Sequence, residues 1–122
     1  MSLVFAHEVG WDLHPLLEIW VEARAEHLLV TVSGEVTAEV AGQLRDVLDP
    51  YTGLHGQRIV VDASRLTTMD GTGLSVLDAA RRRSRSHQGD VEVLDPSQDL
   101  QRCLTARGFS VRTHGPELRA GH

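Results

Sequence analysis

The sequence has 122 residues and a formal net charge of −5, from 12 basic and 17 acidic side chains. This length suits one domain with a single core, and a composition of 41% apolar and 24% charged residues is that of a soluble globular chain. All twelve basic residues are arginine, which excludes chemistry that depends on a lysine, such as a P-loop or a Schiff base. The acidic balance also argues against direct binding of nucleic acid.

The sequence gives no indication of export, membrane insertion or a metal centre. No stretch has the pattern of a signal peptide, and no apolar run approaches the roughly 20 residues that cross a bilayer. Cys103 is the only cysteine, so we expect neither a disulfide framework nor a cysteine-based metal cluster. The seven histidines do not pair at helical spacing, which predicts no metal site. These observations favour a cytoplasmic protein without cofactor or metal.

In the first half of the chain, the hydrophobic pattern predicts an arm, a hairpin and a helix. Residues 1–15 show no clear period and are expected to form an N-terminal arm. Residues 17–22 alternate apolar and polar side chains, as a half-buried strand does, and residues 28–32 are expected to pair with them as a second strand. Thr37 is expected to cap a helix that ends near Pro50. The apolar face of this helix carries Val40, Leu44, Val47 and Leu48.

The second half alternates short strands with helices. The predicted elements are a buried strand over residues 59–61 that ends at Asp62 before a polar loop, a helix over 71–87, a strand over 91–94, a helix from its N-cap Asp95 to Gly108, and a strand over 109–112. Residues 115–122 are expected to form a C-terminal tail. The order β-β-α-β-α-β-α-β predicts an α/β domain over residues 16–114, with a mixed, mostly parallel sheet of about five strands and helices packed on it.

The segment that follows the strand ending at Asp62 is the most informative for function. It leads through a polar loop to Asp70, Gly71, Thr72 and Gly73 at the start of an amphipathic helix. Asp70 is a good N-cap, worth about 1 kcal/mol of helix stability. Each glycine in a helix costs up to about 1 kcal/mol relative to alanine. Two glycines in one first turn therefore predict either a tight turn or the close approach of another backbone.

This segment resembles the signature of STAS domains, the fold of anti-sigma-factor antagonists, in which an apolar strand ends in Asp and a short loop leads to Asp-Ser-Ser/Thr-Gly-Leu at a helix start. In this chain the motif reads Asp70-Gly71-Thr72-Gly73-Leu74. Residues 32–36, Val-Ser-Gly-Glu-Val, resemble the Gly-Glu-Leu-Asp segment of the family. Residues 94–96 and 104–109 resemble its last helix. The resemblance covers roughly residues 16–114 and agrees with the order of elements predicted from periodicity.

The resemblance implies a protein-interaction module without catalytic activity. Such a domain binds an anti-sigma factor of the serine-kinase type and thereby regulates sigma-factor-dependent transcription. An alternative within the family is an accessory subunit that binds the ATPase of a lipid-transport ABC system, and a weak homodimer stays open. The partner-binding residues that the resemblance implies are Glu35, Thr37, Asp70, Gly71, Thr72, Gly73, Leu74 and Ser75.

Two residues depart from the family pattern. The phosphorylatable serine after the aspartate is replaced by Gly71, which has no hydroxyl, and the acidic residue that ends the Gly-Glu-Leu-Asp segment is Thr37. Thr72 is the nearest substitute acceptor, one residue or about 3.8 Å along the chain. A kinase that positions the preceding residue would hold the Thr72 hydroxyl poorly for in-line transfer. We therefore predict that this loop lacks the usual phosphoserine switch.

Other residues that carry chemistry have simpler structural interpretations. Asp62 and Asp70 suggest an acid–base pair, but a strand-end loop anchor and a helix cap are favoured. Cys103 is expected on the inner face of the last helix with Leu100 and Leu104, as a small buried hydrophobic residue. No other residues indicate a catalytic site, so we expect none.

The serines and the arginine run are likewise interpreted as structural. No serine has an identifiable base, and no Gly-x-Ser-x-Gly motif occurs. The arginines of residues 81–85 resemble a nucleic-acid-binding patch when they are taken alone. They end a predicted helix, however, where positive charge complements the helix dipole. We therefore expect them to form a solvated helix end.

Overall fold

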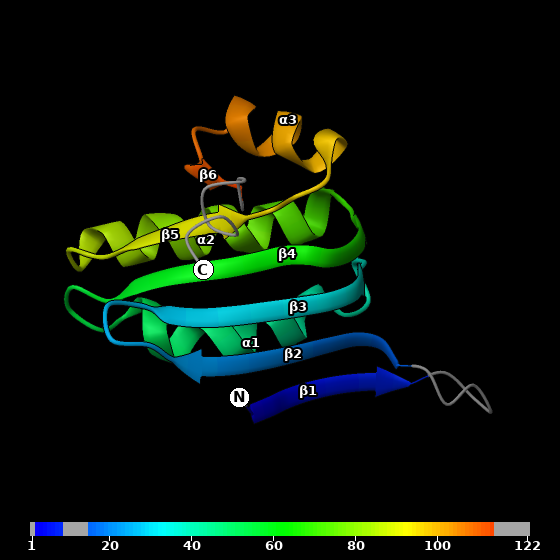
Figure 1. Cartoon of the computed structure of the whole chain (residues 1–122), viewed down its shortest axis with the longest axis horizontal. Helices are drawn as coiled ribbons and strands as arrows, with labels where there is room; N and C mark the ends of the chain where they lie inside the picture. Colours follow the sequence, from blue (N-terminus) through cyan, green and yellow to red (C-terminus); the bar gives the residue numbers. More distant parts are fainter. Residues whose placement is uncertain (1, 9–14, 114–122) are drawn as a thin grey trace, which may run out of the picture.

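The computed structural model describes residues 2–8 and 15–113. Within these residues, six strands form one sheet in the order β1-β2-β3-β4-β5-β6 (Figure 1). The first two pairings are antiparallel and the other three are parallel, which confirms the predicted α/β fold with a mixed sheet. The elements are β1 (Ser2–Glu8), β2 (Pro15–Ala23), β3 (Leu28–Val36), α1 (Ala41–Thr52), β4 (Arg58–Met69), α2 (Gly71–Ser86), β5 (Asp90–Leu94), α3 (Gln98–Ala106) and β6 (Val111–Arg112).

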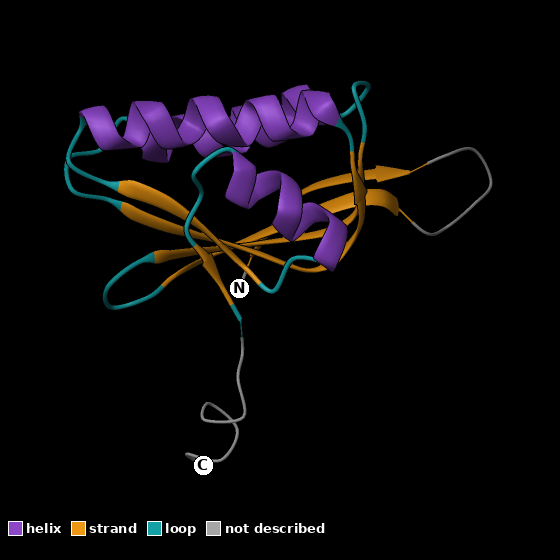
Figure 2. Ribbon diagram, turned by 90° about the horizontal axis from the view of Figure 1, so that it is seen from above, coloured by secondary structure: helices purple, strands orange, loops and turns teal. Residues whose placement is uncertain are grey.

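The core lies between the sheet and its helices. Helices α1 and α2 run side by side over one face of the sheet, and α3 lies at the β6 end (Figure 1, Figure 2). Alternate residues of the central strands point to the helix side because successive side chains of a strand face opposite ways. Of the helix residues predicted on apolar faces, Val40, Leu44, Leu48, Leu100 and Leu104 are buried, and Val47 is partly buried. The fully buried strand residues include Leu17, Ile19, Val30, Val32, Ile59, Val61, Val91 and Val93.

The first strand corrects the interpretation of residues 1–15 as an arm. Ser2–Glu8 forms β1, which pairs antiparallel with β2. The pairing has register shifts between Leu3 and Phe5 and again at the end of the strand. These irregularities break the alternation of side chains, which is why the sequence shows no period there. Residues 9–14 and the predicted tail at 115–122 lie outside the described residues.

Strand β4 is much longer than the predicted strand at residues 59–61. It continues through the segment expected to be a polar loop and ends at Met69. This second half pairs with the second half of β3, for example Ser33 with Arg65 and Glu35 with Thr68. Its side chains are mostly exposed, so the apolar pattern that marks a strand is missing although the backbone pairing continues.

Helix α1 differs from the prediction at both ends. Val40 is the N-cap residue and makes no side-chain cap bond. Thr37 contributes its backbone carbonyl, which accepts from the amides of Val40 and Ala41, instead of its side chain. The helix also continues past Pro50 to Thr52. A proline in the last turn removes only one hydrogen bond, and the buried Thr52 hydroxyl donates to the carbonyl of Asp49 at 3.1 Å.

Helix α3 starts two residues later than its predicted cap. Ser97, and not Asp95, is the N-cap, because the Ser97 hydroxyl accepts from the amide of Leu100 at 3.2 Å. Asp95 has a φ of +54° and belongs to the turn before the helix. Cys103 is exposed, which corrects its assignment to the core. The apolar stripe of this short helix is narrow, and within it only Leu100 and Leu104 are buried.

Candidate functional site

The side chain of Asp70 joins two segments that are far apart in the sequence. Its Oδ1 accepts from the backbone amides of Thr72 and Gly73 at 3.0 and 3.1 Å, which confirms the predicted N-cap of α2. Its Oδ2 accepts from the amide of Ala38, between β3 and α1, at 2.8 Å. The Asp70 amide in turn donates to the carbonyl of Val36 at 3.0 Å. The start of α2 is therefore fixed beside the end of β3.

The two glycines of this turn have different environments. A Cβ on Gly71 would meet no atom within 4 Å, and Gly71 is exposed. A Cβ on Gly73 would lie 2.7 Å from Cγ of Met69 and 2.8 Å from Cγ1 of Val36. A close approach is found at Gly73, but the groups that approach are side chains and not the predicted backbone.

The predicted partner-binding residues lie together but differ in exposure. The register of β3 and β4 places Glu35 opposite Thr68 and Val36 opposite Met69, directly beside the start of α2. Asp70, Gly71, Thr72 and Ser75 are exposed, Glu35 and Thr37 are partly exposed, and Gly73 and Leu74 are buried. We call the six solvent-accessible residues the Asp70 surface: Glu35, Thr37, Asp70, Gly71, Thr72 and Ser75.

A groove of about 410 Å³ between α1 and α2 begins at the Asp70 surface. Thr72 and Ser75 belong both to the groove and to the Asp70 surface. The floor of the groove is mainly apolar, and Arg45 and Arg83 add positive charge. The residues of α2 that line the groove are spaced by three and four, so they form a second stripe beside the buried face of the helix. We did not identify this stripe from the sequence. The groove is lined by Arg45, Leu48, Asp49, Thr72, Ser75, Val76, Ala79, Ala80 and Arg83.

Comparison with known proteins identifies this arrangement. Residues 19–113 match the family model described as "Mlab, STAS domain". The chain belongs to the STAS domain family. The anti-sigma-B factor antagonists of Listeria monocytogenes serovar 1/2a and Listeria innocua serovar 6a are each 28% identical to it over 89 residues, 73% of this chain and 78% of theirs.

Solved structures share the fold of this STAS domain. The anti-sigma factor antagonist SpoIIAA in its unphosphorylated form has a TM-score of 0.66 and 18% identity, over 84% of this chain and 93% of that one. An anti-sigma factor antagonist from Mycobacterium paratuberculosis has a TM-score of 0.68 and 21% identity, over 79% and 85% of the two chains. The motif at Asp70 therefore lies in the fold in which the family places it.

Asp62 is too far from Asp70 to act with it. Asp62 lies within β4, opposite Thr31 of β3 and Leu94 of β5, and its Oδ1 accepts from the amide of Ser64 at 2.9 Å. The eight residues of chain that separate the two carboxylates, nearly all in β4, span about 25 Å. An acid–base pair of Asp62 and Asp70 is excluded, and Asp62 anchors a strand instead of a strand-end loop.

Of the arginines in the last turns of α2, not all point into solvent as the sequence predicted. Arg82 and Arg83 are exposed, as predicted. The hydrogen bond that exposed Arg85 donates to Asp90, together with the charge of that carboxylate, raises the pKa of Arg85. Arg81 is different: its guanidinium donates to the carbonyls of Arg107 and Gly108 at 3.0 and 2.9 Å. It also lies 4.8 Å from the ring centre of Phe109, so Arg81 fastens the end of α3 to α2.

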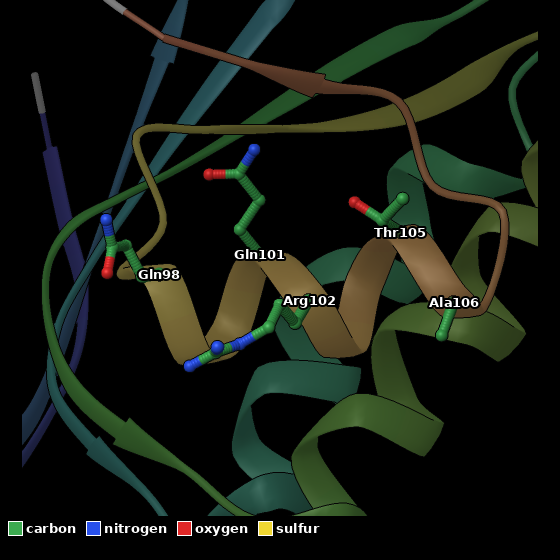
Figure 3. A pocket seen from close by; sticks show the side chains of 5 residues that line it. All are labelled: Gln98, Gln101, Arg102, Thr105 and Ala106. Atoms are coloured by element: carbon green, nitrogen blue, oxygen red, sulfur yellow. The ribbon is translucent and has the colours of Figure 1, made fainter.

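A hollow of about 610 Å³ lies along α3 (Figure 3). It is lined by Gln98, Gln101, Arg102, Thr105 and Ala106, a set without an acid–base pair. Among residues 2–8 and 15–113, no three His, Cys, Asp or Glu side chains group in a way that would hold a metal ion. No helix in this part of the chain is long and apolar enough to cross a membrane.

Proposed function

We propose that this STAS domain is an anti-sigma factor antagonist that binds an anti-sigma factor of the serine-kinase type through the Asp70 surface and so releases a sigma factor. The observation that carries the proposal is the double role of Asp70, which fixes the start of α2 beside the β3–α1 connection. The similarity to the Listeria antagonists supports it. We place this action in the cytoplasm, where bacterial transcription occurs, and assign this chain no catalytic step.

The Asp70 surface has the properties of a docking site for a rigid partner. Its backbone is held by hydrogen bonds that do not depend on the partner, so little conformational entropy is lost on binding. Gly71 lets a partner approach the backbone of α2 closely because no side chain stands there. Gly73 and Leu74 are buried and support this surface from below.

Calorimetric titration with the cognate anti-sigma factor tests the interface. Gly71→Arg should weaken binding at least about 100-fold, because the long side chain would point into the space that the partner occupies. The melting temperature should stay within about 2 °C of wild type, since a side chain at Gly71 meets no atom of this domain. Ala106→Arg, on the exposed outer side of α3, is the matched control and should bind as wild type. Equal affinities of wild type and Gly71→Arg would contradict the proposal.

We further propose that the interaction lacks the phosphoserine switch. A phosphate carries a charge of about −1.5 to −2 and next to Asp70 would oppose docking, but Gly71 offers no acceptor. After incubation with the kinase and ATP, mass spectrometry should find wild type unmodified at Thr72 and Gly71→Ser modified at residue 71. Stoichiometric phosphothreonine at Thr72 would overturn this prediction.

A second candidate is the accessory subunit of a lipid-transport ATPase. Gly71 favours it, because a subunit that binds constitutively needs no phosphate acceptor. Purification of the tagged chain from its native cell separates the two candidates. The first predicts a kinase-like anti-sigma factor in the complex, and the second predicts a transporter ATPase. In either case Gly71→Arg should remove the partner if the Asp70 surface is the interface.

A further inference from the structure

The groove between α1 and α2 continues the Asp70 surface along the helices. Strands β3 and β4 are parallel, so the helices that follow them begin at the same edge of the sheet and run in the same direction. The groove therefore starts where both helices start, at Thr72 and Ser75, and runs toward the end of α1. From Thr72 to Arg83 it follows α2 for about 16 Å, which is three helical turns.

The floor of the groove is apolar, and its side chains are small where α2 forms it. Ala79 is exposed, Val76 is partly buried, and Leu48 of α1 is fully buried. The backbone groups of both helices are already paired within the helices, so the groove offers no ladder of backbone hydrogen bonds to an extended segment. A helix satisfies its own backbone and can pack its side chains between two others. It therefore suits this groove better than a strand does.

Two arginines lie at the two ends of the groove. Arg83 takes part in hydrogen bonds through its backbone carbonyl, and its guanidinium has no carboxylate partner among residues 2–8 and 15–113. Its Nη2 lies 3.0 Å from the position that a Cβ on Gly53 would take, directly after α1. The Nη2 of Arg45 lies 3.6 Å from the corresponding position at Gly42, in the first turn of α1. Its ion pair with Asp46, at 3.6 Å, is exposed and contributes little.

The charge of the groove is opposite in sign to that of the whole chain. Its lining carries Arg45, Arg83 and Asp49, a net charge of +1, whereas the chain carries −5. Asp49 is about one turn beyond Arg45 on α1, so the positive charge is confined to the two ends. A ligand with negative charge at its ends and apolar side chains between them complements this pattern.

We propose that the groove binds an amphipathic helix of the anti-sigma factor, with its apolar face on the floor and an acidic residue at each end, opposite Arg45 and Arg83. Gly42 and Gly53, beside which the two guanidinium groups lie, are eleven residues or about 16 Å apart along α1. Eleven residues are also about three turns of the partner's helix, so two acidic residues at that spacing lie on one face of it.

This inference rests on the proposed function and extends its interface. Thr72 and Ser75 belong both to the Asp70 surface and to the groove, so one partner can cover the two without a gap. The Asp70 surface would position the partner at the start of α2, and the groove would hold a second segment of the same partner. The two parts of the interface can be tested by different substitutions, because Gly71 does not line the groove.

Calorimetric titration with the cognate anti-sigma factor tests the charge of the groove. Arg83→Glu should weaken binding at least about tenfold, because it places a negative charge opposite the acidic end of the partner's helix. Arg82→Glu is the matched control, with the same change of charge in an exposed neighbour that does not line the groove. It should bind within about twofold of wild type. Higher salt should reduce the difference between the two variants.

Ala79→Trp tests the shape of the groove in the same titration. The indole ring would occupy the floor and should weaken binding at least about tenfold. The melting temperature should stay within about 2 °C of wild type, because Ala79 is exposed. Ala106→Trp, at an exposed position of α3, is the matched control and should bind as wild type.

Cross-linking identifies what occupies the groove. The photoreactive residue p-benzoylphenylalanine, introduced at Ala79, should cross-link to a helical segment of the anti-sigma factor with acidic residues at both ends of its apolar face. Cross-links to a second copy of this chain, or to a segment without acidic residues, would overturn the inference.

The variant Gly71→Arg separates this inference from the proposed function. If Gly71→Arg loses binding while either Arg83→Glu or Ala79→Trp keeps wild-type affinity, the groove is not part of the interface and the proposed function stands. If wild type does not bind the anti-sigma factor, the proposed function and this inference are both wrong.

Discussion

The inner and outer sides of the first turn of α2 differ in what they contribute. On the inner side, Gly73 and Leu74 are buried, and Gly73 is in contact range of side chains from β3 and β4. On the outer side, Gly71 and Thr72 are exposed, and Gly71 has open space where a side chain would stand. Within a single helical turn, one pair of residues holds the fold and the other is available to a partner.

Stability and binding can therefore be changed separately in this domain. Substitutions on the inner side should lower the free energy of unfolding, and their effect on binding should follow from the loss of fold. Substitutions on the outer side should change binding without lowering the free energy of unfolding. Three pairs of variants measure these contributions, each by chemical denaturation with the two-state analysis that a small single domain allows.

The largest effect is expected from Leu77→Ala. Leu77 is on the inner side of α2, one turn beyond Leu74, and 1% of its surface is exposed. Removing its side chain leaves a cavity and should cost about 2–5 kcal/mol. Ser75→Ala, on the outer side of the same turn, should change the free energy of unfolding by less than about 0.5 kcal/mol. Similar losses for both variants would show that α2 is not packed on this side.

A smaller effect is expected from Gly73→Ala. The new Cβ would fall less than 3 Å from side-chain atoms of Val36 and Met69, so these must move, at a cost of about 1–3 kcal/mol. The same substitution two residues earlier, Gly71→Ala, should have the opposite sign. The added methyl group would contact no other atom, and alanine has a higher helix propensity than glycine. The variant should therefore be more stable by about 0.5–1 kcal/mol. If both glycines respond alike, the comparison between the two sides fails.

The smallest effect distinguishes two helix caps. Asp70→Ala removes the cap of α2 together with the bond to the amide of Ala38, and should cost about 1–2 kcal/mol. Ser97→Ala removes a cap that serves α3 alone, and should cost about 0.5–1 kcal/mol. The difference between the two losses measures the connection between α2 and the end of β3. Equal losses would mean that the bond to Ala38 contributes nothing.

Local rules predicted most of the features that a residue forms with its own neighbourhood in the chain. The cap at Asp70 was predicted because its partners are the amides two and three residues later. Alternation predicted the buried face of β2, and helical spacing predicted that of α1. The same rules placed the cap of α3 two residues early, since Asp95, Pro96 and Ser97 all suit a helix start and only the backbone conformation selects Ser97.

The second half of β4 and the edge strand β1 were missed for a common reason. Each is held by hydrogen bonds to a strand that is distant in the sequence or irregular in register, and neither shows the alternation of a half-buried strand. Backbone pairing leaves no mark on side-chain polarity when both faces of a strand meet solvent or a bulge interrupts it. Cys103 was wrongly assigned to the core for a related reason. The width of the buried stripe on α3 depends on which neighbouring elements cover the helix, and the sequence of the helix does not show this.

The sequence by itself therefore determined the order of elements, the buried helix faces, the cap at Asp70 and the family to which the chain belongs, since each depends on residues close together in the chain. Only the tertiary structure decided that Asp70 also binds Ala38, that Gly73 is enclosed while Gly71 is free, and that β1 completes the sheet. These features depend on the distance between separate segments of the chain, or on the space left around a missing side chain. Such distances follow from the packing of the whole domain, because no local pattern specifies which atoms meet across the core.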